Sequence, residues 1–183
     1  MSLLALETGE REIIEACRRG ERDAFRVLFE THKDKVYSIA LRYSGDESLA
    51  MDIAQDAFLK LFSSLPDFRG DSAFSTWMYR LVVNACLDHK RRSWRLAPLA
   101  DELIAVLRAP GDCLNALLQS ETRDRVRAAV ETLSPDMRMA VVLRYTEGLS
   151  YDEIAEVMGC SAGTVASRLN RAHKALERKL SHV

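Results

Sequence analysis

The sequence lacks the features by which several classes of protein are recognised. Its four cysteines, Cys17, Cys86, Cys113 and Cys160, stand far apart and form no Cys-x-x-Cys pair, which argues against a disulfide framework and favours a reducing compartment. Cys86 and His89 are three residues apart on an expected helix, but no second pair completes a four-ligand metal site. We therefore expect neither a metal nor another cofactor.

Long apolar runs and catalytic motifs are also missing. No apolar run approaches the ~18 residues that a transmembrane helix needs, and the N-terminus has no charged-then-apolar pattern of a secretory signal. There is no phosphate-cradling glycine loop, no Ser-His-Asp pattern and no paired metal motif. These absences predict a cytoplasmic protein that is not an enzyme.

What the sequence does contain is helical periodicity. Almost every long segment spaces its apolar residues at i, i+3, i+4 and i+7, and alternating strand patterns are absent, so an all-α fold is predicted. The periodicity weakens over residues 96–119, where Pro98 and Pro110 interrupt it. We expect two small helical domains, residues 1–95 and 120–183, joined there by a flexible linker.

Positive charge gathers in two places although the formal net charge is only -1. Residues 80–95 hold five basic side chains against one acidic, and residues 161–182 hold the same numbers. Two basic elements suit a bipartite contact with a polyanion such as nucleic acid. Each is equally compatible with a solvated helix end, where Lys and Arg are favoured by the helix dipole.

The third helix expected in the N-terminal half carries an acidic face. Helices are predicted first up to Gly20, then from near Asp23, and then from about Leu49 to Leu61. Asp52 and Asp56 are one turn apart with Gln55 between them, so the three share a surface patch. Acid-base chemistry, a partner-binding patch and a plain solvated face all fit this spacing.

A fourth helix is expected from Ser75, as its N-cap, to about Arg92. Arg80, Asn84, Asp88 and Arg91 recur along it at steps of four, four and three. This polar stripe suits the reading of bases, although an exposed helix often has the same pattern. Trp77 on this helix is predicted to belong to the core rather than to stack on a base.

The last fifty residues predict a helix-turn-helix. Ser134 and Pro135 announce one helix, and the capping box of Ser150 and Glu153 starts the next. Gly159 ends that helix, and Ser161 is an N-cap for another only two residues later. This spacing is typical of a helix-turn-helix.

The final helix divides into two opposed stripes. The apolar stripe consists of Val165, Leu169, Ala172 and Leu176. The polar stripe consists of Ser167, Asn170, Arg171 and Lys174, with Thr164 near the helix start. In the major groove, Arg pairs with guanine and Asn with adenine, each good pair worth roughly 1–3 kcal/mol of discrimination. DNA binding is favoured over a helical hairpin that mediates only protein contacts.

Three segments together resemble the extracytoplasmic-function sigma factors of bacterial RNA polymerase. They are residues 52–58 (DIAQDAF), residues 74–80 (FSTWMYR) and residues 163–172 (GTVASRLNRA), with Asn84 and Asp88 between the last two. The resemblance is nearly full length and covers both expected domains in order. It implies sigma region 2 over about residues 10–95 and sigma region 4 over about residues 120–180.

The resemblance also implies the site residues. Asp52, Gln55 and Asp56 would dock on core polymerase at the clamp helices of the β′ subunit. The β flap of the polymerase would be a further contact of the chain. The minus-10 promoter element and an unstacked base would be captured by Phe68, Arg69, Arg80, Asn84, Asp88, Arg91 and Arg92. The minus-35 element would be bound by Thr164, Ser167, Arg168, Asn170, Arg171 and Lys174. Ala166 and His173 stand where many family members carry a basic side chain, which implies weaker phosphate contact.

The leading hypothesis is a dissociable specificity subunit that binds core polymerase and directs it to promoter DNA. Such factors are commonly held inactive by an anti-sigma protein, so an anti-sigma partner is also implied. A stand-alone helix-turn-helix regulator that binds a palindromic operator is the alternative. The patch containing Asp52 argues against that alternative, because a stand-alone regulator has no need of a polymerase contact.

Overall fold

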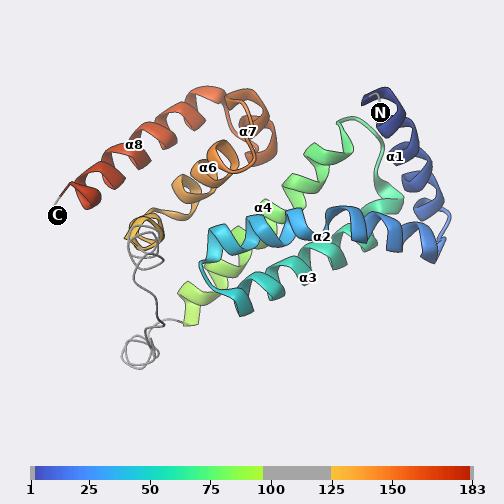
Figure 1. The fold of residues 1–183 in the computed structure, drawn as a ribbon, viewed down its shortest axis with the longest axis horizontal. Helices are drawn as coiled ribbons and strands as arrows, with labels where there is room; N and C mark the ends of the chain where they lie inside the picture. Colours follow the sequence, from blue (N-terminus) through green and yellow to red (C-terminus); the bar gives the residue numbers. More distant parts are fainter. Residues whose placement is uncertain (1–2, 97–124, 182–183) are drawn as a thin grey trace, which may run out of the picture. The chain divides into compact units, whose positions relative to one another are not determined.

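The computed structural model describes residues 3–96 and 125–181, which contain helices and turns and no strand, as expected for an all-α protein. Its contacts divide the chain into two compact units, Met1–Ala85 and Cys86–Val183, called here the N-terminal and the C-terminal unit. Figure 1 shows their helices along the chain. Apart from Leu96, the expected linker lies outside the described residues, so its boundaries stay predictions.

The N-terminal unit is a bundle of long helices. Its elements are α1 (Leu3–Arg18), α2 (Arg22–Ser44), α3 (Glu47–Ser64), the short 3-10 helix η1 (Leu65–Asp67) and the first half of α4 (Phe74–Leu96). Helix α2 packs against both α1 and α3, and η1 contacts the same two helices (Figure 1). The largest fully buried core side chains include Leu28, Val36, Ile39, Ile53, Leu61, Met78 and Val82.

Turn chemistry separates the helices of this bundle. Helix α2 ends at Gly45, whose φ of 75° is strained for residues with a side chain. Asp46 then caps α3 by accepting a hydrogen bond from the Leu49 N–H at 2.8 Å. The predicted N-cap at Ser75 is wrong, because α4 begins one residue earlier and the Trp77 N–H bonds to the Ala73 carbonyl. The buried Phe74 ring belongs to the first turn, where it contacts the His32 ring.

Beyond α4, the described part of the C-terminal unit consists of four helical segments joined by turns. A helical segment over residues 125–131 is followed by α6 (Pro135–Tyr145), α7 (Tyr151–Met158) and α8 (Ala162–Leu180). Helix α8 packs against α6 and α7, which also contact each other. The core comprises Met139, Leu143, Ile154, Val165, Leu169 and Ala172, among others.

Most predicted signals at the ends of these helices are confirmed. Ser150 and Glu153 form the capping box of α7 with both reciprocal hydrogen bonds. Gly159 ends α7 in the left-handed conformation, and Ser161 accepts a hydrogen bond from the Thr164 N–H at 3.1 Å to cap α8. Ser134 precedes Pro135 at the start of α6 as expected, but its side chain makes no capping hydrogen bond.

Candidate protein and nucleic-acid interfaces

The acidic patch, defined as Asp52, Gln55 and Asp56, lies on α3. Asp52 and Gln55 are exposed and Asp56 is half-buried. The opposite edge of the helix, which includes Ile53 and Ala57, is buried in the bundle. The sequence prediction that the three polar residues share one surface therefore holds. All three side chains are thus at least partly accessible from solvent.

An apolar groove of about 830 Å³ runs beside this patch, between α2 and α3. Its lining residues are Phe25, Phe29, Lys33, Asp34, Tyr37, Met51, Ala54, Gln55, Phe58, Leu59 and Phe62. Met51, Leu59 and Phe62 are 63%, 59% and 58% exposed, which is unusual for large apolar side chains that stand so close together. Gln55 belongs to both the acidic patch and the groove lining, so the two features form one continuous surface.

Sequence reasoning missed this groove. Helical periodicity places Phe25 and Phe29 on the apolar stripe of α2, yet both are half-buried and line the groove. The signal was available on α3, where Met51, Leu59 and Phe62 fall outside the buried stripe. A helix with apolar residues on a second face either packs on both sides or offers one side to a partner.

A small loop pocket of about 170 Å³ lies at the start of α4. Its lining residues are Asp67, Phe68, Arg69, Gly70, Asp71, Ser72, Trp77 and Arg80. The structure thus brings together Phe68, Arg69 and Arg80 from the predicted minus-10 set. Gly70 has a φ of 78°, a conformation that L side chains rarely adopt, and it turns the loop at this point.

Two aromatic rings, those of Phe68 and Trp77, line the loop pocket. The Phe68 ring lies 4.9 Å from Trp77 and 5.8 Å from Phe74 in edge-on or tilted geometry. Trp77 was expected in the core, but it is only half-buried and contributes to the pocket wall. Phe68 and Trp77 therefore present an aromatic surface to the pocket, and both rings contact Phe74.

The other predicted minus-10 residues follow the pocket along α4. Asn84 is exposed one turn beyond Arg80, and Asp88 is half-buried a further turn on. Arg91 and Arg92 lie in the last turns of the same helix. These four residues therefore lie progressively farther along α4 from the loop pocket.

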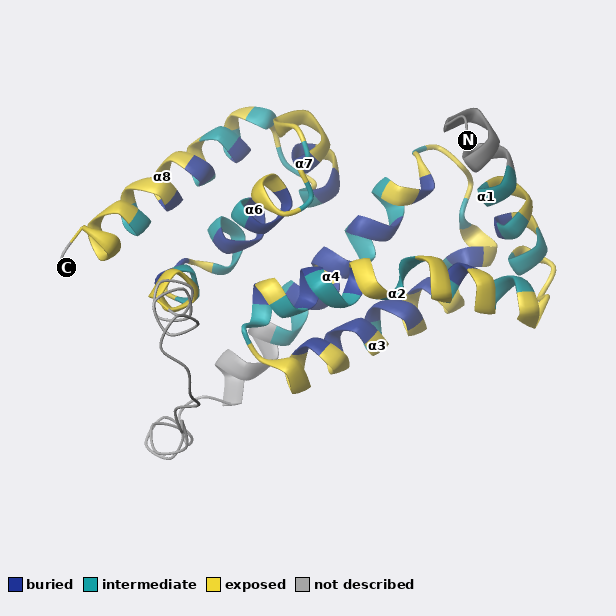
Figure 2. Cartoon of the chain, viewed as in Figure 1, coloured by how far each residue is buried: buried dark blue, intermediate teal, exposed yellow. Residues whose placement is uncertain are grey.

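The two predicted stripes of α8 are present in the C-terminal unit. Val165, Leu169 and Ala172 are buried, and Leu176 is half-buried. The exposed residues are Ser167, Asn170, Arg171 and Lys174, with Thr164 half-buried at the helix start. Figure 2 shows α8 buried along one edge and exposed along the other. The apolar stripe therefore packs α8 against the core and leaves the polar stripe accessible.

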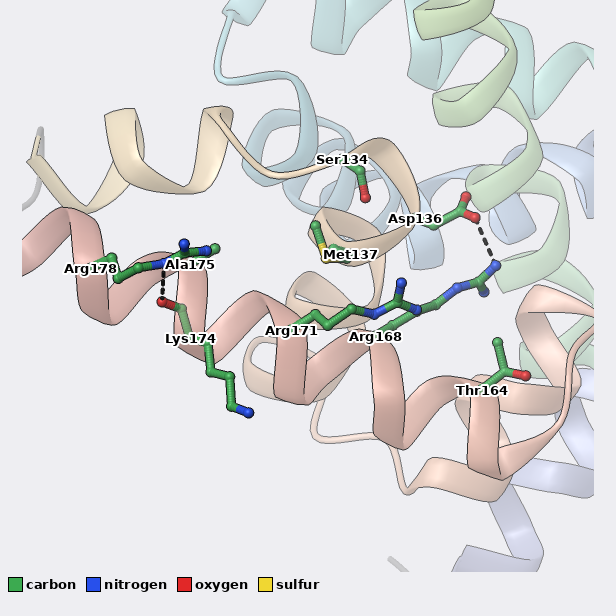
Figure 3. A pocket seen from close by; sticks show the side chains of 9 residues that line it. All are labelled: Ser134, Asp136, Met137, Thr164, Arg168, Arg171, Lys174, Ala175 and Arg178. Carbon is green, nitrogen blue, oxygen red and sulfur yellow. Dashed lines mark hydrogen bonds and ion pairs between the residues drawn. The ribbon is translucent and has the colours of Figure 1, made fainter.

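A cationic cleft of about 650 Å³ separates α8 from the first turn of α6. Its lining residues are Ser134, Asp136, Met137, Thr164, Arg168, Arg171, Lys174, Ala175 and Arg178 (Figure 3). Four cationic side chains thus line a cleft that contains a single carboxylate, which makes the cleft attractive to an anion. Arg178 was not predicted, although it continues the spacing of three and four that joins Arg171 to Lys174.

The cationic side chains of the cleft differ in their hydrogen-bond partners. Arg168 donates to the Asp136 carboxylate at 2.7 Å and is only 18% exposed. Arg171 donates to the Ser167 carbonyl at 3.2 Å, and Arg178 donates to the Lys174 carbonyl at the same distance. Figure 3 shows Lys174 pointing away from α6.

A second lateral contact joins α6 to α8. The Tyr145 hydroxyl lies 2.7 Å from His173 Nε2, and the two rings are 5.7 Å apart. His173 is one of the positions where the sigma resemblance implied a basic residue. In this chain its ring is instead engaged by a tyrosine from the end of α6.

Neither a membrane-spanning helix nor a metal site is found within the described ranges. No helix there is long and apolar enough to cross a membrane, and no group of His, Cys, Asp and Glu there is arranged to hold a metal ion. Cys86 is completely buried, and that burial raises the pKa of its thiol to about 12. The Cys86 thiol therefore stays protonated and unreactive at neutral pH.

Comparison with known proteins identifies the family. The family model for sigma-70 region 2 matches residues 28–96, and the model for sigma-70 region 4 matches residues 123–176. The chain is 37% identical over 182 residues to the ECF RNA polymerase sigma-E factor of Escherichia coli K12, covering 93% of this chain and 94% of that protein. It is 36% identical to the RNA polymerase sigma-H factor of Pseudomonas aeruginosa, covering 93% of each.

Solved structures agree with this assignment. CnrH in complex with the cytosolic domain of CnrY matches with a TM-score of 0.67 at 25% identity, covering 94% of this chain and 97% of that one. RpoE of Bartonella quintana, in complex with the anti-sigma factor NepR, shows the same fold with a TM-score of 0.65. It covers 86% of this chain and 97% of its own. The chain belongs to the extracytoplasmic-function group of the sigma-70 family and is a sigma factor that directs RNA polymerase to promoters.

Proposed function

We propose that this sigma factor binds core RNA polymerase through the acidic patch and the apolar groove of its N-terminal unit. Asp52 and Asp56 supply charge at the edge, while the exposed Met51, Leu59 and Phe62 supply apolar area for a partner to bury. The partner element is the clamp helices of the β′ subunit, because an apolar groove between two helices suits a helical partner. The β flap is the further contact, made by the C-terminal unit.

The loop pocket is the proposed capture site for an unstacked base of the minus-10 element. Its size of about 170 Å³ suits one nucleobase, Trp77 offers a ring face, and Arg69 and Arg80 supply donors and positive charge. Holding one base outside the stack costs a few kcal/mol, which pocket contacts offset. Asn84, Asp88, Arg91 and Arg92 extend this contact along α4.

The minus-35 element is assigned to α8. Thr164, Ser167, Asn170, Arg171 and Lys174 lie on its accessible side, and the capped turn before Ser161 orients the helix start. The proposal rests on one observation above all. A groove suited to a protein partner and a cationic helix-turn-helix suited to DNA occur in separate units of one chain.

We further propose control by an anti-sigma protein that covers the apolar groove. The similar RpoE was solved with its anti-sigma factor, and an exposed apolar groove is a surface that an inhibitory partner can occupy in place of polymerase. The chain would act in the cytoplasm, where RNA polymerase is found. It would make or break no covalent bond itself.

The decisive experiment is run-off transcription with core RNA polymerase on a pooled promoter library. Wild type is compared with Asp56→Arg and Arg171→Ala. Glu12→Arg on α1 and Arg125→Ala in the segment 125–131 are matched controls, because both are exposed and lie outside every proposed interface.

Distinct outcomes are expected for the two units. Asp56→Arg abolishes start-site-specific transcripts, Arg171→Ala reduces transcripts from promoters that carry a minus-35 element, and both controls transcribe like wild type. The proposal fails if the wild-type chain binds duplex operators tightly alone and never programs core polymerase. That result favours a stand-alone regulator instead.

A further inference from the structure

Arg168 differs from its cationic neighbours on α8. The sequence pattern grouped it with the residues that contact DNA, but it lies on the flank of the helix, between the buried and the exposed stripes. Its side chain is 18% exposed, whereas Arg171, one turn later, is exposed. A side chain so far withdrawn from solvent has less freedom to reach a phosphate.

One guanidinium joins three segments of the C-terminal unit. Arg168 Nη2 donates to Asp136 Oδ2 at 2.7 Å, across 32 residues, in the first turn of α6. Arg168 Nη1 donates to Cys160 Sγ at 3.4 Å, in the turn between α7 and α8. Charge-assisted hydrogen bonds of this kind fix direction as well as distance, because the planar guanidinium holds its donors rigidly.

We propose that Arg168 and Asp136 form a positioning pair that fixes the recognition helix against α6, and that DNA phosphate is bound by Arg171, Lys174 and Arg178 instead. This inference rests on the proposed function of α8 in promoter recognition. Arg168 acts through its neighbours: it fixes the orientation of α8 and thereby the place of the cations that follow it. Arg178 is a DNA contact that the sequence pattern did not assign.

The charges of the cleft support this division. Arg168 and Asp136 form the one ion pair found between lining residues of this cleft in the described part of the chain. The guanidinium groups of Arg171 and Arg178 donate hydrogen bonds to uncharged oxygens of their own helix. Because Arg168 neutralises the one carboxylate of the cleft, the positive charge of the other three cations remains available to a phosphate.

The test measures promoter binding by the holoenzyme as a function of salt, on a promoter selected by run-off transcription. Each lost phosphate contact lowers the slope of log affinity against log salt by about 0.9. Arg171→Ala, Lys174→Ala and Arg178→Ala are each expected to show that reduction. Arg168→Ala is expected to weaken binding about tenfold while the slope stays as in wild type.

The direction in which promoter binding changes when Asp136 is replaced provides a second test. A carboxylate that merely repels DNA strengthens binding when it is removed, whereas the partner in a positioning pair weakens binding when removed. Asp136→Ala is therefore expected to weaken binding about as much as Arg168→Ala, and the double variant no more than either single variant. Asp152→Ala is the matched control, because Asp152 holds the equivalent place in the first turn of α7 and is exposed.

A second measurement separates positioning from simple stability. The swapped pair Asp136→Arg with Arg168→Asp restores part of the upstream preference if pairing orients α8. All variants are compared well below their unfolding temperatures, and on a promoter without the minus-35 element, where wild type and variants should bind equally.

Two results would overturn the inference: a salt slope that falls in Arg168→Ala as it does in Arg171→Ala, or stronger binding by Asp136→Ala. If the wild-type holoenzyme binds no promoter, the proposed function fails, and the assignment of phosphate contacts fails with it. Hydrogen exchange of the α8 amides in the free chain still decides whether the pair holds the helix. Faster exchange in Arg168→Ala and Asp136→Ala, but not in Arg171→Ala, supports it, and equal exchange in all three refutes it.

Discussion

Both units of this sigma factor are built from packed helices, but the surfaces that they expose differ in chemical character. In the N-terminal unit, α2 and α3 leave an apolar groove edged by carboxylates. In the C-terminal unit, α6 and α8 leave a cleft lined by four cations. Helix-on-helix packing uses only one face of each helix, so the free face is open to specialisation. The difference teaches that partner class is set by what the packing leaves exposed rather than by the fold.

The two surfaces should also respond differently to solution conditions. Binding that buries apolar area depends little on salt, whereas binding to phosphates releases counterions and weakens steeply as salt rises. Polymerase binding through the groove and promoter binding through the cleft are therefore separable by ionic strength. The following predictions test that separation, from the largest expected effect to the smallest.

Removal of the exposed apolar side chains of the groove should have the largest effect. Met51→Ser with Phe62→Ser is expected to weaken the affinity for core polymerase by about 2 kcal/mol per side chain, the range of interface hot spots. The loss should be equal at low and high salt. Quantitative binding of labelled sigma factor to core polymerase measures it.

The control for that variant is Val27→Ser, which removes an exposed apolar residue of α2 that does not line the groove. It should bind like wild type. Thermal unfolding of all variants should stay close to wild type, because side chains that are mostly exposed add little to folding stability. A loss of binding that disappears at high salt would contradict the apolar character of this interface.

A cavity in the core of the C-terminal unit should have the next largest effect. Leu169 is almost completely buried, and Leu169→Ala is expected to cost about 3 kcal/mol, a large share of the stability of a small domain. Minus-35 recognition should be lost while affinity for core polymerase through the groove stays near that of wild type. Hydrogen exchange of α6 to α8, together with polymerase binding, measures both.

Asn170→Ala is the neighbouring control, since Asn170 is exposed beside Leu169 on the same helix. It should leave stability within about 0.5 kcal/mol of wild type, although it alters base preference. Equal loss of polymerase binding and minus-35 recognition in Leu169→Ala would show that the two units do not act independently.

The same contrast explains which parts of the structure were predictable. In the C-terminal unit, local capping residues mark the helix ends. The caps predicted at Ser150, Glu153, Gly159 and Ser161 are all present. Such signals act over three or four residues, so a sequence shows them directly. The N-cap of α4 was misplaced by two residues, at Ser75 instead of Ala73, because the buried Phe74 is the first residue of the helix.

Contacts that span long stretches of sequence were not predictable. The pairing of Arg168 with Asp136 crosses 32 residues, and helical periodicity says nothing about which flank residues of two helices meet. The apolar groove was missed for a similar reason. Periodicity identifies Phe25 and Phe29 as apolar-face residues, but only the packed bundle shows that they border an open surface.

The capping box of α7 should make a smaller contribution that depends on acid. Ser150→Ala removes the N-cap and is expected to cost about 1 kcal/mol of C-terminal-unit stability. The Ser150 backbone N–H, and then its hydroxyl, lower the pKa of Glu153 below its ordinary value. A lowered carboxyl pKa gives stability that is present above the ordinary glutamate pKa of about 4.3 and lost as pH falls through the folded-state pKa.

Glu153→Gln keeps the shape of the box and removes its titration, so it tests this acid dependence. Hydrogen exchange of the α7 amides should rise in wild type below about pH 4 and change less in Glu153→Gln. A variant that responds to acid as steeply as wild type would show that another carboxylate governs the response.

The smallest effect is expected at His32, which makes the N-terminal unit sensitive to milder acid than the C-terminal unit. The His32 side chain is 13% exposed, its Nε2 lies 3.5 Å from Glu10 Oε1 on α1, and its ring is 5.6 Å from Phe74. Burial, with the charge of Lys35 as a second cause, lowers the pKa of His32. At 3.5 Å the Glu10 carboxylate attracts a proton on His32 too weakly to offset the loss of water.

The sign follows from which state binds protons more readily. The unfolded chain has an ordinary histidine pKa of about 6.5, so on acidification it takes up the proton before the folded unit does. The N-terminal unit should therefore lose stability as pH falls from about 7 to 5, while the C-terminal unit should hold until the carboxylates titrate. His32→Phe should flatten this dependence in hydrogen exchange of α2. His173→Phe, which changes an exposed histidine of α8, should leave α2 exchange as in wild type, and an unchanged pH slope in His32→Phe would assign the acid response to a different group.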